Sequence, residues 1–385
     1  MNDQVTKTNM KNRGKQPSQN TIMQLCARSA GRCQFDGCNK NLFVEGLTLK
    51  RGYFGEIAHN VASSAGGPRG DGAKSSILSD DVDNLLLLCH EHHKLVDDNP
   101  EEYTEARLRD MKRKHEMMIA HHCELIWKES SEVVRLVSPI KGTHNATINP
   151  QQTTEAIIPK FRPASERGIT IRIEPLCGYN SPEYWEQADS ELTSRVGLLF
   201  DSILKDNPNQ HFSVFPLGPI PLIAKLGYLI GDKIRCDVYQ KFRTPDTWKW
   251  ITEYQTNVFS VTKNTIREGN RVALILSLTD TINENRVTAV FNADTIYAIS
   301  AEQTGVFCLQ SLADLTEFWK AYQAVCNEIT NSNPGVTEIA VFPAVPVSAA
   351  FSLGYRYMPG VYPKMTIYEE NNGFIETISF GGKIL

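Results

Sequence analysis

The chain has 385 residues, of which 22% are charged and 41% hydrophobic, and its formal net charge is −4. This composition is typical of globular proteins with sizeable cores. No apolar run reaches the roughly 18 residues that a membrane span needs, and the slightly acidic balance gives no overall signature of nucleic-acid binding. The length predicts two domains, possibly with a third segment between them.

The first 20 residues are polar and lack the apolar segment of a secretory signal. We expect residues 1–20 to form a mildly basic, disordered tail. The chain holds nine cysteines. An odd number without a signal indicates a reducing cytoplasm, with some cysteines as metal ligands and the rest as buried thiols. We therefore predict a cytoplasmic protein that does not bind membranes.

Two short-spaced pairs of metal-binding residues follow the tail. "GRCQFDGCNK" contains Cys33 and Cys38, and "CHEH" contains Cys89 and His92. Two such pairs separated by a long insertion are typical of a structural zinc site. Thiolates with one imidazole suit tetrahedral Zn²⁺ better than Mg²⁺. These four residues are thus predicted to hold Zn²⁺, and buried free cysteines are the alternative.

Three further polar residues lie between and after these pairs. His59 ends the strand-like run "GEIAH", and Asn84 lies in "DDVDNLLLLCHEHH", which we expect to be a loop leading into a helix. Neighbouring side chains on a helix point about 100° apart. If His92 faces zinc, His93 therefore faces another side, so that one helix can serve two metals. A packed strand histidine and a helix N-cap are the plain alternatives for His59 and Asn84.

The order Cys-x4-Cys, His, Asn, Cys-x2-His-His resembles that of HNH endonucleases of the ββα-metal fold. The resemblance implies that His59 activates water, that Asn84 orients the His59 ring or holds the loop, and that His93 ligates Mg²⁺ or a similar divalent ion. Many HNH enzymes have an Asp just before the first His, where this chain has Ala58. Glu56 is then the remaining candidate for a second ligand of the catalytic metal, although a regular strand places it opposite His59.

A basic stripe follows in "RLRDMKRKHE". Its cations can be a solvated helix face, but beside a nuclease site we expect them to contact DNA phosphates. The predicted DNA contacts are Arg107, Arg109, Lys112 and Arg113. The HNH domain is predicted to span residues 21–130. Residues 131–165, rich in Thr, Asn, Gln and Pro, have the composition of a linker.

From residue 166 to residue 385, strand-like runs alternate with helix-like stretches, which predicts an α/β domain with a largely parallel sheet. This domain contains an internal repeat. "VFPLGPIPLIAKLGY" from Val214 aligns without gaps with "VFPAVPVSAAFSLGY" from Val341, with seven of fifteen positions identical. A duplication can serve folding alone. The alternative is a pseudosymmetric ligand pocket at the strand ends.

An HNH module joined to a duplicated α/β domain resembles the effector nucleases of bacterial CBASS antiphage defence. Their SAVED domain is a fusion of two CARF-like units that binds cyclic oligonucleotides. The resemblance covers residues 21–385. It implies a DNA endonuclease that degrades double-stranded DNA after binding a second messenger, expected to be a cyclic dinucleotide, and after assembling into a homo-oligomer such as a dimer or tetramer.

A cyclic dinucleotide presents two bases that stack on aromatic rings and two phosphates that attract cations. We expect its contacts among aromatic, basic and turn residues near the repeats, although packing or surface roles are the alternative for each. The candidates are Pro216, Lys225, Tyr239, Lys241, Arg243, Trp248, Ser348, Arg356 and Tyr368.

Two other functions fit parts of the sequence. A restriction-type HNH nuclease with a DNA-recognising C-terminal domain predicts a basic second domain. Residues 131–385 instead hold 22 Lys and Arg against 26 Asp and Glu, which disfavours this function. A non-enzymatic zinc-binding module with a scaffold domain predicts that loss of His59 has no effect.

Overall fold

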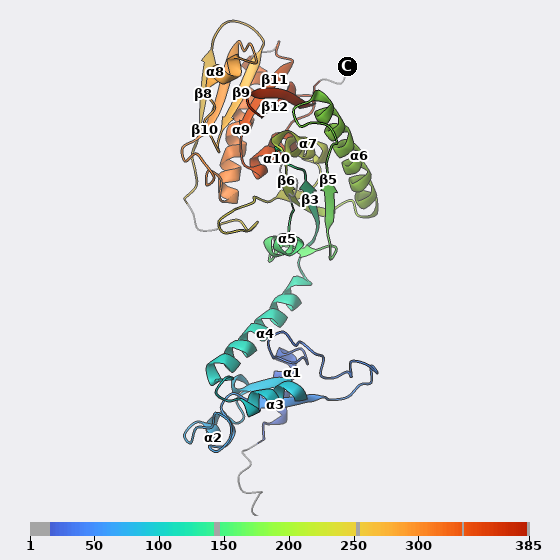
Figure 1. The fold of residues 1–385 in the computed structure, drawn as a ribbon, viewed down its shortest axis with the longest axis vertical. Coiled ribbons are helices and arrows are strands. Elements are labelled where there is room, and N and C mark those ends of the chain that lie inside the picture. The colour runs from blue at the N-terminus through green and yellow to red at the C-terminus, as the bar shows by residue number, and fades with distance from the viewer. Residues whose placement is uncertain (1–15, 142–146, 252–254, 333–334, 383–385) are drawn as a thin grey trace, which may run out of the picture. The chain divides into compact units, whose positions relative to one another are not determined.

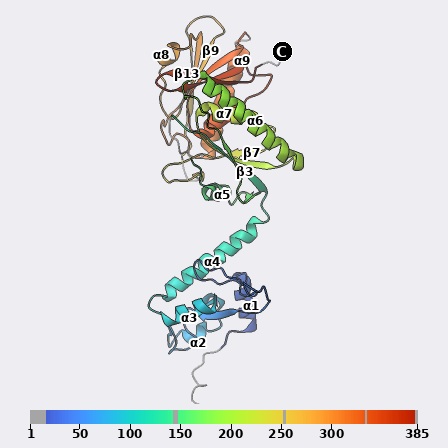
Figure 2. The same ribbon diagram turned by 45° about the vertical axis from the view of Figure 1, so that its right-hand side comes forward.

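The computed structural model describes residues 16–141, 147–251, 255–332 and 335–382, and Figures 1 and 2 show its ribbon from two sides. The chain divides into two compact units, the first ending at Trp127 and the second beginning at Lys128. Within the described ranges, no helix combines the length and the apolar character needed to cross a membrane.

The beginning of the first unit overlaps the predicted tail. Residues 1–15 of that tail lie outside the described residues. Helix α1 (Gln19–Arg28) begins before residue 20, because the Ser18 side chain accepts a hydrogen bond from the Thr21 backbone N–H and caps the helix. The tail prediction is therefore wrong for its last residues, where a Ser N-cap satisfies one of the free N–H groups of the first turn.

A short hairpin followed by a helix forms the centre of the first unit. Strand β1 (Gly55–His59) pairs antiparallel with β2 (Leu85–Cys89), and α3 (His90–Asp98) begins directly after β2. The loop that we expected before α3 is thus wrong for Leu85–Leu88, which are fully buried and form a strand. A short apolar run fits either a buried strand or a helix, and here pairing with β1 decides.

The remaining elements of this unit pack around the hairpin. Helix α2 (Ser75–Leu78) and the 3-10 helix η1 (Val82–Asn84) precede β2, and α4 (Glu105–Leu125) follows α3. Leu25 of α1, Val96 of α3, and Leu108 and Met111 of α4 are buried in one core with the leucines of β2. This core fixes α3 against the hairpin.

The second unit contains two sheets. One runs in the order β4-β3-β6-β7, with β5 also paired to β3, and all its pairs are parallel. The other runs β13-β12-β11-β9-β10-β8, with antiparallel edge strands β13 and β8. The strands are β3 (Ser130–Val137), β4 (Arg162–Pro163), β5 (Ile169–Arg172), β6 (His211–Leu217), β7 (Cys236–Val238), β8 (Phe259–Thr265), β9 (Val272–Ser277), β10 (Thr295–Ala301), β11 (Glu338–Ala344), β12 (Lys364–Glu370) and β13 (Phe374–Phe380).

Helices cover these sheets, and in both views α6 runs along the outside of the second unit. The described helices are α5 (Pro150–Ile157), α6 (Pro182–Asp206), α7 (Ile220–Ile230), α8 (Glu284–Thr288), α9 (Leu312–Ser332) and α10 (Val347–Tyr355). The predicted α/β class is confirmed, but the strands form two largely parallel sheets where the sequence predicted one.

The linker predicted over residues 131–165 is wrong. Strand β3 lies between β6 and β5 in the first sheet, and Val134 and Leu136 belong to the main core. Helix α5 begins after the cap residue Asn149 with Pro150 in its first turn, and Ile157 is buried. Residues 141–155 have the polar composition on which the linker prediction rested, but the apolar run "VVRLV" before them forms a buried strand. Residues 142–146 lie outside the described residues.

The repeated sequence is a structural repeat. Strand β6 with α7, and β11 with α10, are related by the same shift of 127 residues that aligns the two sequences. Helices α7 and α10 cross at their glycines. A Cβ added to Gly227 would lie 2.0 Å from the Phe351 carbonyl oxygen, and one added to Gly354 would lie 2.0 Å from the Ala224 carbonyl oxygen. Since Ala224 and Phe351 are equivalent in the repeat, the crossing is symmetric.

Candidate functional site

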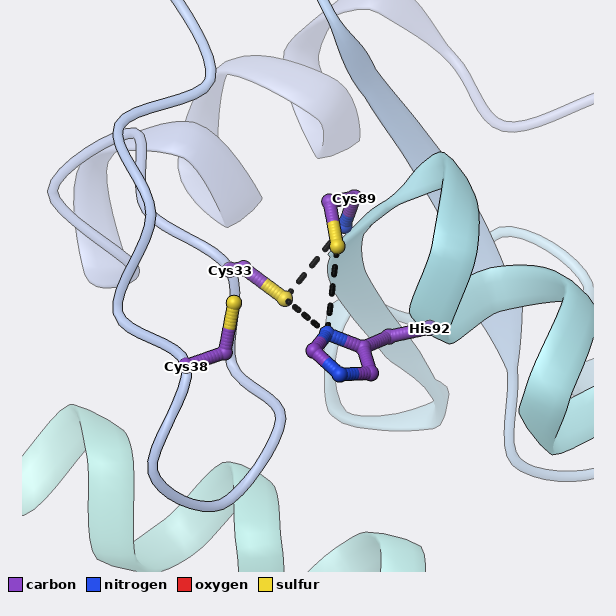
Figure 3. A group of neighbouring side chains, drawn as sticks. All are labelled: Cys33, Cys38, Cys89 and His92. Atoms are coloured by element: carbon purple, nitrogen blue, oxygen red, sulfur yellow. Dashed lines mark hydrogen bonds between the residues drawn. The ribbon is translucent and has the colours of Figure 1, made fainter. Parts of the chain in front are cut away.

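The four residues predicted to hold zinc lie together in the first unit (Figure 3). Cys33 and Cys38 come from the turns after α1, Cys89 ends β2, and His92 lies in the first turn of α3. Their ligand atoms all lie within 4.8 Å of one another. The His92 Nδ1 atom lies 3.1 Å from Cys89 Sγ and 3.7 Å from Cys33 Sγ. The sequence prediction of this cluster is confirmed.

The chemistry of this cluster fits Zn²⁺. Three sulfurs and one imidazole nitrogen form the donor set of a closed tetrahedral zinc site. Burial raises the pKa of Cys33 to about 12, so a nearby cation is needed to hold that thiol as a thiolate. The Phe35 ring, which the sequence did not single out, stacks on the His92 ring at 4.0 Å between centroids and fixes its orientation. Zinc itself stays a prediction.

A second polar cluster lies on another side of α3. His93 Nδ1 is 3.3 Å from Glu56 Oε2 on β1 and 3.7 Å from Asp97 Oδ2 one turn further along α3. The other oxygen of Glu56 contacts His90 Nδ1. As expected from adjacent helix positions, His93 does not belong to the cysteine cluster. One imidazole between two carboxylates offers the N and O donors that divalent ions such as Mg²⁺, Mn²⁺ or Ni²⁺ accept.

Asp97 supplies a carboxylate that sequence reasoning missed. Ala58, the position where many HNH enzymes have an Asp, is fully buried in the core and contributes no ligand. The i, i+4 spacing from His93 to Asp97 was the available signal, because residues four apart share one helix face. The contact between Glu56 and His93 supports the choice of Glu56 as a ligand candidate, although the strand alternation had made it the weaker one.

His59, the predicted general base, is half-buried at the end of β1, and its Nε2 lies 3.3 Å from the Ser79 carbonyl oxygen. Burial is the main cause that lowers the pKa of His59; the carbonyl of Ser79 and the charge of Asp97 oppose this effect, and His93 adds to it. The ring is therefore neutral near pH 7. A carbonyl can only accept, so Nε2 carries the hydrogen and the lone pair of Nδ1 is available to accept a proton.

Asn84, predicted to orient the His59 ring or to hold the loop, holds the loop. Its Oδ1 accepts from the Val61 N–H at 2.9 Å, and its Nδ2 donates to the carbonyls of Val61 at 2.9 Å and Leu78 at 3.1 Å. Asn84 is fully buried. These three bonds use most of the capacity of the amide, and they fix the chain just after His59.

Arg69 is a further residue that sequence reasoning missed. Its guanidinium donates to the carbonyls of His59 (3.3 Å), Asn60 (2.9 Å) and Val96 (3.0 Å), and it pairs with Asp97 Oδ1 at 3.2 Å. It thereby joins the end of β1 to the end of α3, the two elements that carry His59 and His93. Only 7% of its side chain is exposed, and its φ of 56° lies in the left-handed region. No sequence motif signalled this role.

The four basic residues predicted to contact DNA all pair with carboxylates on or beside α4. The pairs are Arg107 with Glu102, Arg109 with Glu105, Lys112 with Glu116, and Arg113 with Asp110. The prediction is wrong for Lys112, which is 4% exposed. Burial, the main cause, lowers the pKa of this amine. The helix turns Lys112 inward with Leu108 and Met111, whereas the three arginines stay exposed.

The rings predicted to stack on the cyclic nucleotide are buried in the second unit. Tyr239, Trp248 and Tyr368 are 4%, 1% and 7% exposed. Tyr239 stacks on Phe215 at 4.5 Å, and Tyr368 stacks on Phe342 at 4.4 Å, in two separate clusters. Tyr239 and Trp248 belong to one hydrophobic core, and Tyr368 belongs to another. The three rings therefore form no shared stacking surface.

Two of the basic residues predicted to bind phosphate are already paired. Lys225 is 9% exposed and its Nζ lies 2.8 Å from Asp189 Oδ1, which ties α7 to α6. Lys241 pairs with Asp246. Arg243 is exposed in the loop after β7. Carboxylates thus already hold Lys225 and Lys241, whereas Arg243 is exposed to solvent.

The other three candidates lie around α10 and β6. Ser348 is fully buried, and its hydroxyl donates to Gln240 Oε1 at 2.8 Å, a bond between the two halves. Arg356 lies over the Trp319 ring at 3.9 Å, and its buried Nε has no hydrogen-bond partner among the described residues. Pro216 is buried in β6. The nine candidates thus lie in separate places, and none of them lines the open surface hollow of about 640 Å³ beside β8 and α9.

Comparisons with known proteins identify part of the chain. Residues 199–380 match the family model of SAVED, the SMODS-associated and fused to various effectors sensor domain. No curated protein matches the chain. The chain is similar to the solved structure of the Acinetobacter baumannii Cap4 SAVED/CARF-domain containing receptor with the cyclic trinucleotide 2'3'3'-cAAA, with a TM-score of 0.45 and 12% identity over 80% of this chain and 64% of that one.

A second similar structure is the Moraxella osloensis Cap4 SAVED/CARF-domain containing receptor, with a TM-score of 0.40 and 11% identity over 75% of this chain and 60% of that one. The chain therefore spans less than two thirds of each of these two structures. The family model thus matches residues 199–380, which lie within the part of the chain where the sequence predicted a SAVED domain.

Proposed function

We propose that the chain is a DNA endonuclease of HNH type that a cyclic oligonucleotide activates through the SAVED domain, in bacterial antiphage defence. The observation that carries the nuclease part is the second cluster of the first unit. His59, with a pKa lowered by burial, lies at the end of β1, and His93 lies between the carboxylates of Glu56 and Asp97 on the adjoining α3. A neutral base beside a divalent-metal donor set is what phosphodiester hydrolysis requires.

Glu56, His93 and Asp97 would hold a divalent ion such as Mg²⁺. When bound, such an ion neutralises the charge that develops on the phosphate. The reaction itself needs a base: His59 Nδ1 takes a proton from water while the water oxygen forms a bond to phosphorus and the bond to the leaving oxygen breaks. The Ser79 carbonyl holds the His59 ring in the tautomer that leaves Nδ1 free.

The cysteine cluster has a structural role in this proposal. Cys33, Cys38, Cys89 and His92 would hold Zn²⁺ and join the turns after α1 to the start of α3. His93 is the next residue after His92. The zinc site therefore sets where α3 begins, and with it the direction in which His93 points. Four protein donors that leave no open position are typical of structural zinc sites.

The SAVED domain suggests how the nuclease is controlled. The matched family is a sensor domain that occurs fused to various effectors, so a signal bound by the second unit would act on the first. We propose that a cyclic dinucleotide or a related cyclic oligonucleotide binds this domain and shifts the protein toward a homo-oligomer, in which two nuclease units act on opposite strands of a duplex.

The test is degradation of plasmid DNA with Mg²⁺ and a panel of cyclic di- and trinucleotides. Wild type is compared with His59→Ala and with the control His121→Ala, which removes an exposed histidine of α4. We expect cleavage with one or two messengers, its loss in His59→Ala and its retention in the control. Cleavage without any messenger would support the nuclease activity but refute its control by a cyclic oligonucleotide. Full activity of His59→Ala would refute the proposed chemistry.

A further inference from the structure

The segment between the zinc-binding turns and β1 forms a projecting hairpin, residues 43–54, which we name the finger. Figure 1 draws it in blue, extending sideways from the first unit. Its two arms are joined by the bridge between Val44 and Arg51 and by the bonds from Glu45 N–H to Lys50 C=O (2.9 Å) and from Gly52 N–H to Phe43 C=O (3.1 Å).

The tip of the finger has a defined turn. Glu45 Oε2 accepts from the Leu47 N–H at 3.0 Å, from the Thr48 N–H at 2.5 Å and from the Thr48 hydroxyl at 2.7 Å. The Thr48 N–H bond is the main cause that lowers the pKa of Glu45. Leu49 completes the turn with a φ of 56°. The single acidic residue in the sequence of the finger thus binds the finger's own turn.

This turn presents apolar side chains to solvent. Leu47 and Leu49 are 89% and 73% exposed, and Phe43, Tyr53 and Phe54 are also exposed. Single exposed apolar residues are common, but a cluster on one projecting hairpin marks an interaction site. Glu45 fixes the backbone of the turn on which Leu47 lies, and both leucines are exposed there.

The charges of the finger favour a nucleic acid as its partner. Lys50 and Arg51 are exposed and form no ion pair with any other described residue. The arginines of α4, in contrast, are all paired with carboxylates. Two unpaired cations beside an apolar tip match proteins that contact DNA phosphates and insert apolar side chains into a groove.

The position of the finger in the chain fits the same partner. Phe54 directly precedes β1, and Glu56 of the proposed catalytic cluster lies only two residues beyond it. Leu49 at the tip is seven residues before Glu56, so at about 3.3 Å per residue in an extended arm it lies within roughly 23 Å of that cluster. Since DNA rises about 3.4 Å per base pair along each strand, this reach covers about seven base pairs.

We propose that the finger enters a groove of the substrate duplex beside the scissile phosphate. Lys50 and Arg51 contact phosphates of the two strands, while Leu47 and Leu49 contact sugars and base edges. This inference rests on the proposed nuclease function and names the surface by which the nuclease unit holds its duplex. A groove contact of this kind adds affinity with little sequence preference.

The test measures binding of the full chain, made inactive by His59→Ala, to a short fluorescent DNA duplex at several salt concentrations with the cyclic-nucleotide panel present. Two pairs of substitutions are added: Lys50→Gln with Arg51→Gln, and Leu47→Ser with Leu49→Ser. The matched control is Arg195→Gln with Lys320→Gln, which removes two exposed cations of the second unit that are each paired with a carboxylate of their own helix. Zinc content and circular dichroism confirm that each variant is folded.

We expect the Lys50/Arg51 variant to bind about tenfold more weakly at moderate salt, with a salt slope reduced by about 2. The Leu47/Leu49 variant should bind more weakly by a similar factor at every salt concentration, with an unchanged slope. The control should stay within about twofold of the parent.

Four results would overturn the inference. Unchanged DNA binding of both finger variants would remove the finger from the interface. Unchanged binding with a lower oligomer mass would make a second copy of this chain its partner. If the parent neither binds DNA nor, as wild type, cleaves it, the proposed function fails and the inference with it. Retained wild-type cleavage with unaffected finger variants would refute the inference alone.

Discussion

The symmetric crossing of α7 and α10 allows a quantitative prediction about stability. A Cβ at Gly227 would lie 2.0 Å from a backbone oxygen of the other helix, whereas ordinary contacts are 3.4–4 Å. The helices must therefore separate by about 1.4 Å to admit one methyl group. Overpacking of this kind costs typically about 1–3 kcal/mol. Here it falls at the upper end, because the obstacle is backbone and both helices are packed in one core.

Helix propensity acts in the opposite direction. Alanine is favoured over glycine inside a helix by about 1 kcal/mol, so we expect Gly227→Ala to destabilise the second unit by about 2 kcal/mol net of this gain. Gly354→Ala should lower the free energy of unfolding by about the same amount, since its added Cβ would lie 2.0 Å from the Ala224 carbonyl oxygen. The double variant should cost less than the sum, because the first methyl group already separates the helices.

The assay is denaturant unfolding of the full chain followed by tryptophan fluorescence, since four of the five tryptophans lie in the second unit. Gly197→Ala is the matched control: this glycine is exposed on α6 and has no atom within 4 Å of an added Cβ. The free energy of unfolding of this control should rise by up to about 1 kcal/mol, because alanine is the better helix former. If Gly227→Ala is stabilised as the control is, the reasoning about the crossing is wrong.

Buried polar and metal-binding groups give four further predictions. Burial raises the pKa of Glu369 to about 7. Between about pH 4.3 and 7 the folded state therefore keeps a proton that the unfolded state releases. The free energy of unfolding falls as pH rises through this window. Glu369→Gln, which retains an acceptor for the Tyr179 hydroxyl, should raise the unfolding midpoint at pH 8 and not at pH 4. Asn84→Asp should cost about 2–4 kcal/mol in denaturant unfolding of the first unit, because a carboxylate cannot donate to two buried carbonyls. Burial lowers the pKa of His59, so cleavage should persist as pH falls below about 6.5 and be lost only below the lowered pKa; a bound cation lowers this pKa further and leaves the sign unchanged. Chelation of zinc, or Cys33→Ser, should abolish cleavage and lower the melting temperature of the first unit.

Each of these has a contradicting outcome. If Glu369→Gln raised the unfolding midpoint equally at pH 4 and pH 8, ionisation of Glu369 would not be the cause of the stabilisation. Normal stability with lost cleavage in Asn84→Asp would return this residue to orienting the base. If cleavage were already lost as pH falls through about 7, a group other than His59 would control the rate. Full activity and stability of the chelated protein, with metal content measured as zero, would leave the cysteine cluster without the role proposed for it.

The sequence predicted which cysteines lie together with His92 because the spacings within each pair are short and local. Cys33 and Cys38 need only one turn between them, and Cys89 and His92 need only one turn of helix. The repeat was equally visible, since a duplication preserves the spacing between its strand and its helix. The orientation of His93 followed from helix geometry alone.

Tertiary contacts decided the rest. The strand alternation placed Glu56 away from His59, but the approach of α3 brings His93 against it. Tyr239 and Tyr368 are aromatic in a position that suits either a ligand or a core, and only burial distinguishes the two. Arg69 binds three carbonyls and one carboxylate from separate segments, a pattern that no spacing in the chain encodes.

The adjacency of His92 and His93 has a consequence for the newly made protein. In the proposed enzyme, a single peptide bond separates a zinc ligand from a residue of the cutting centre. A chain that has not yet acquired zinc lacks the restraint that sets the direction of His93, so its hydrolytic centre is incomplete. If the proposed function holds, metal loading would act as a safeguard for the host chromosome, since a newly made copy without zinc would not cleave DNA even if a signal were present.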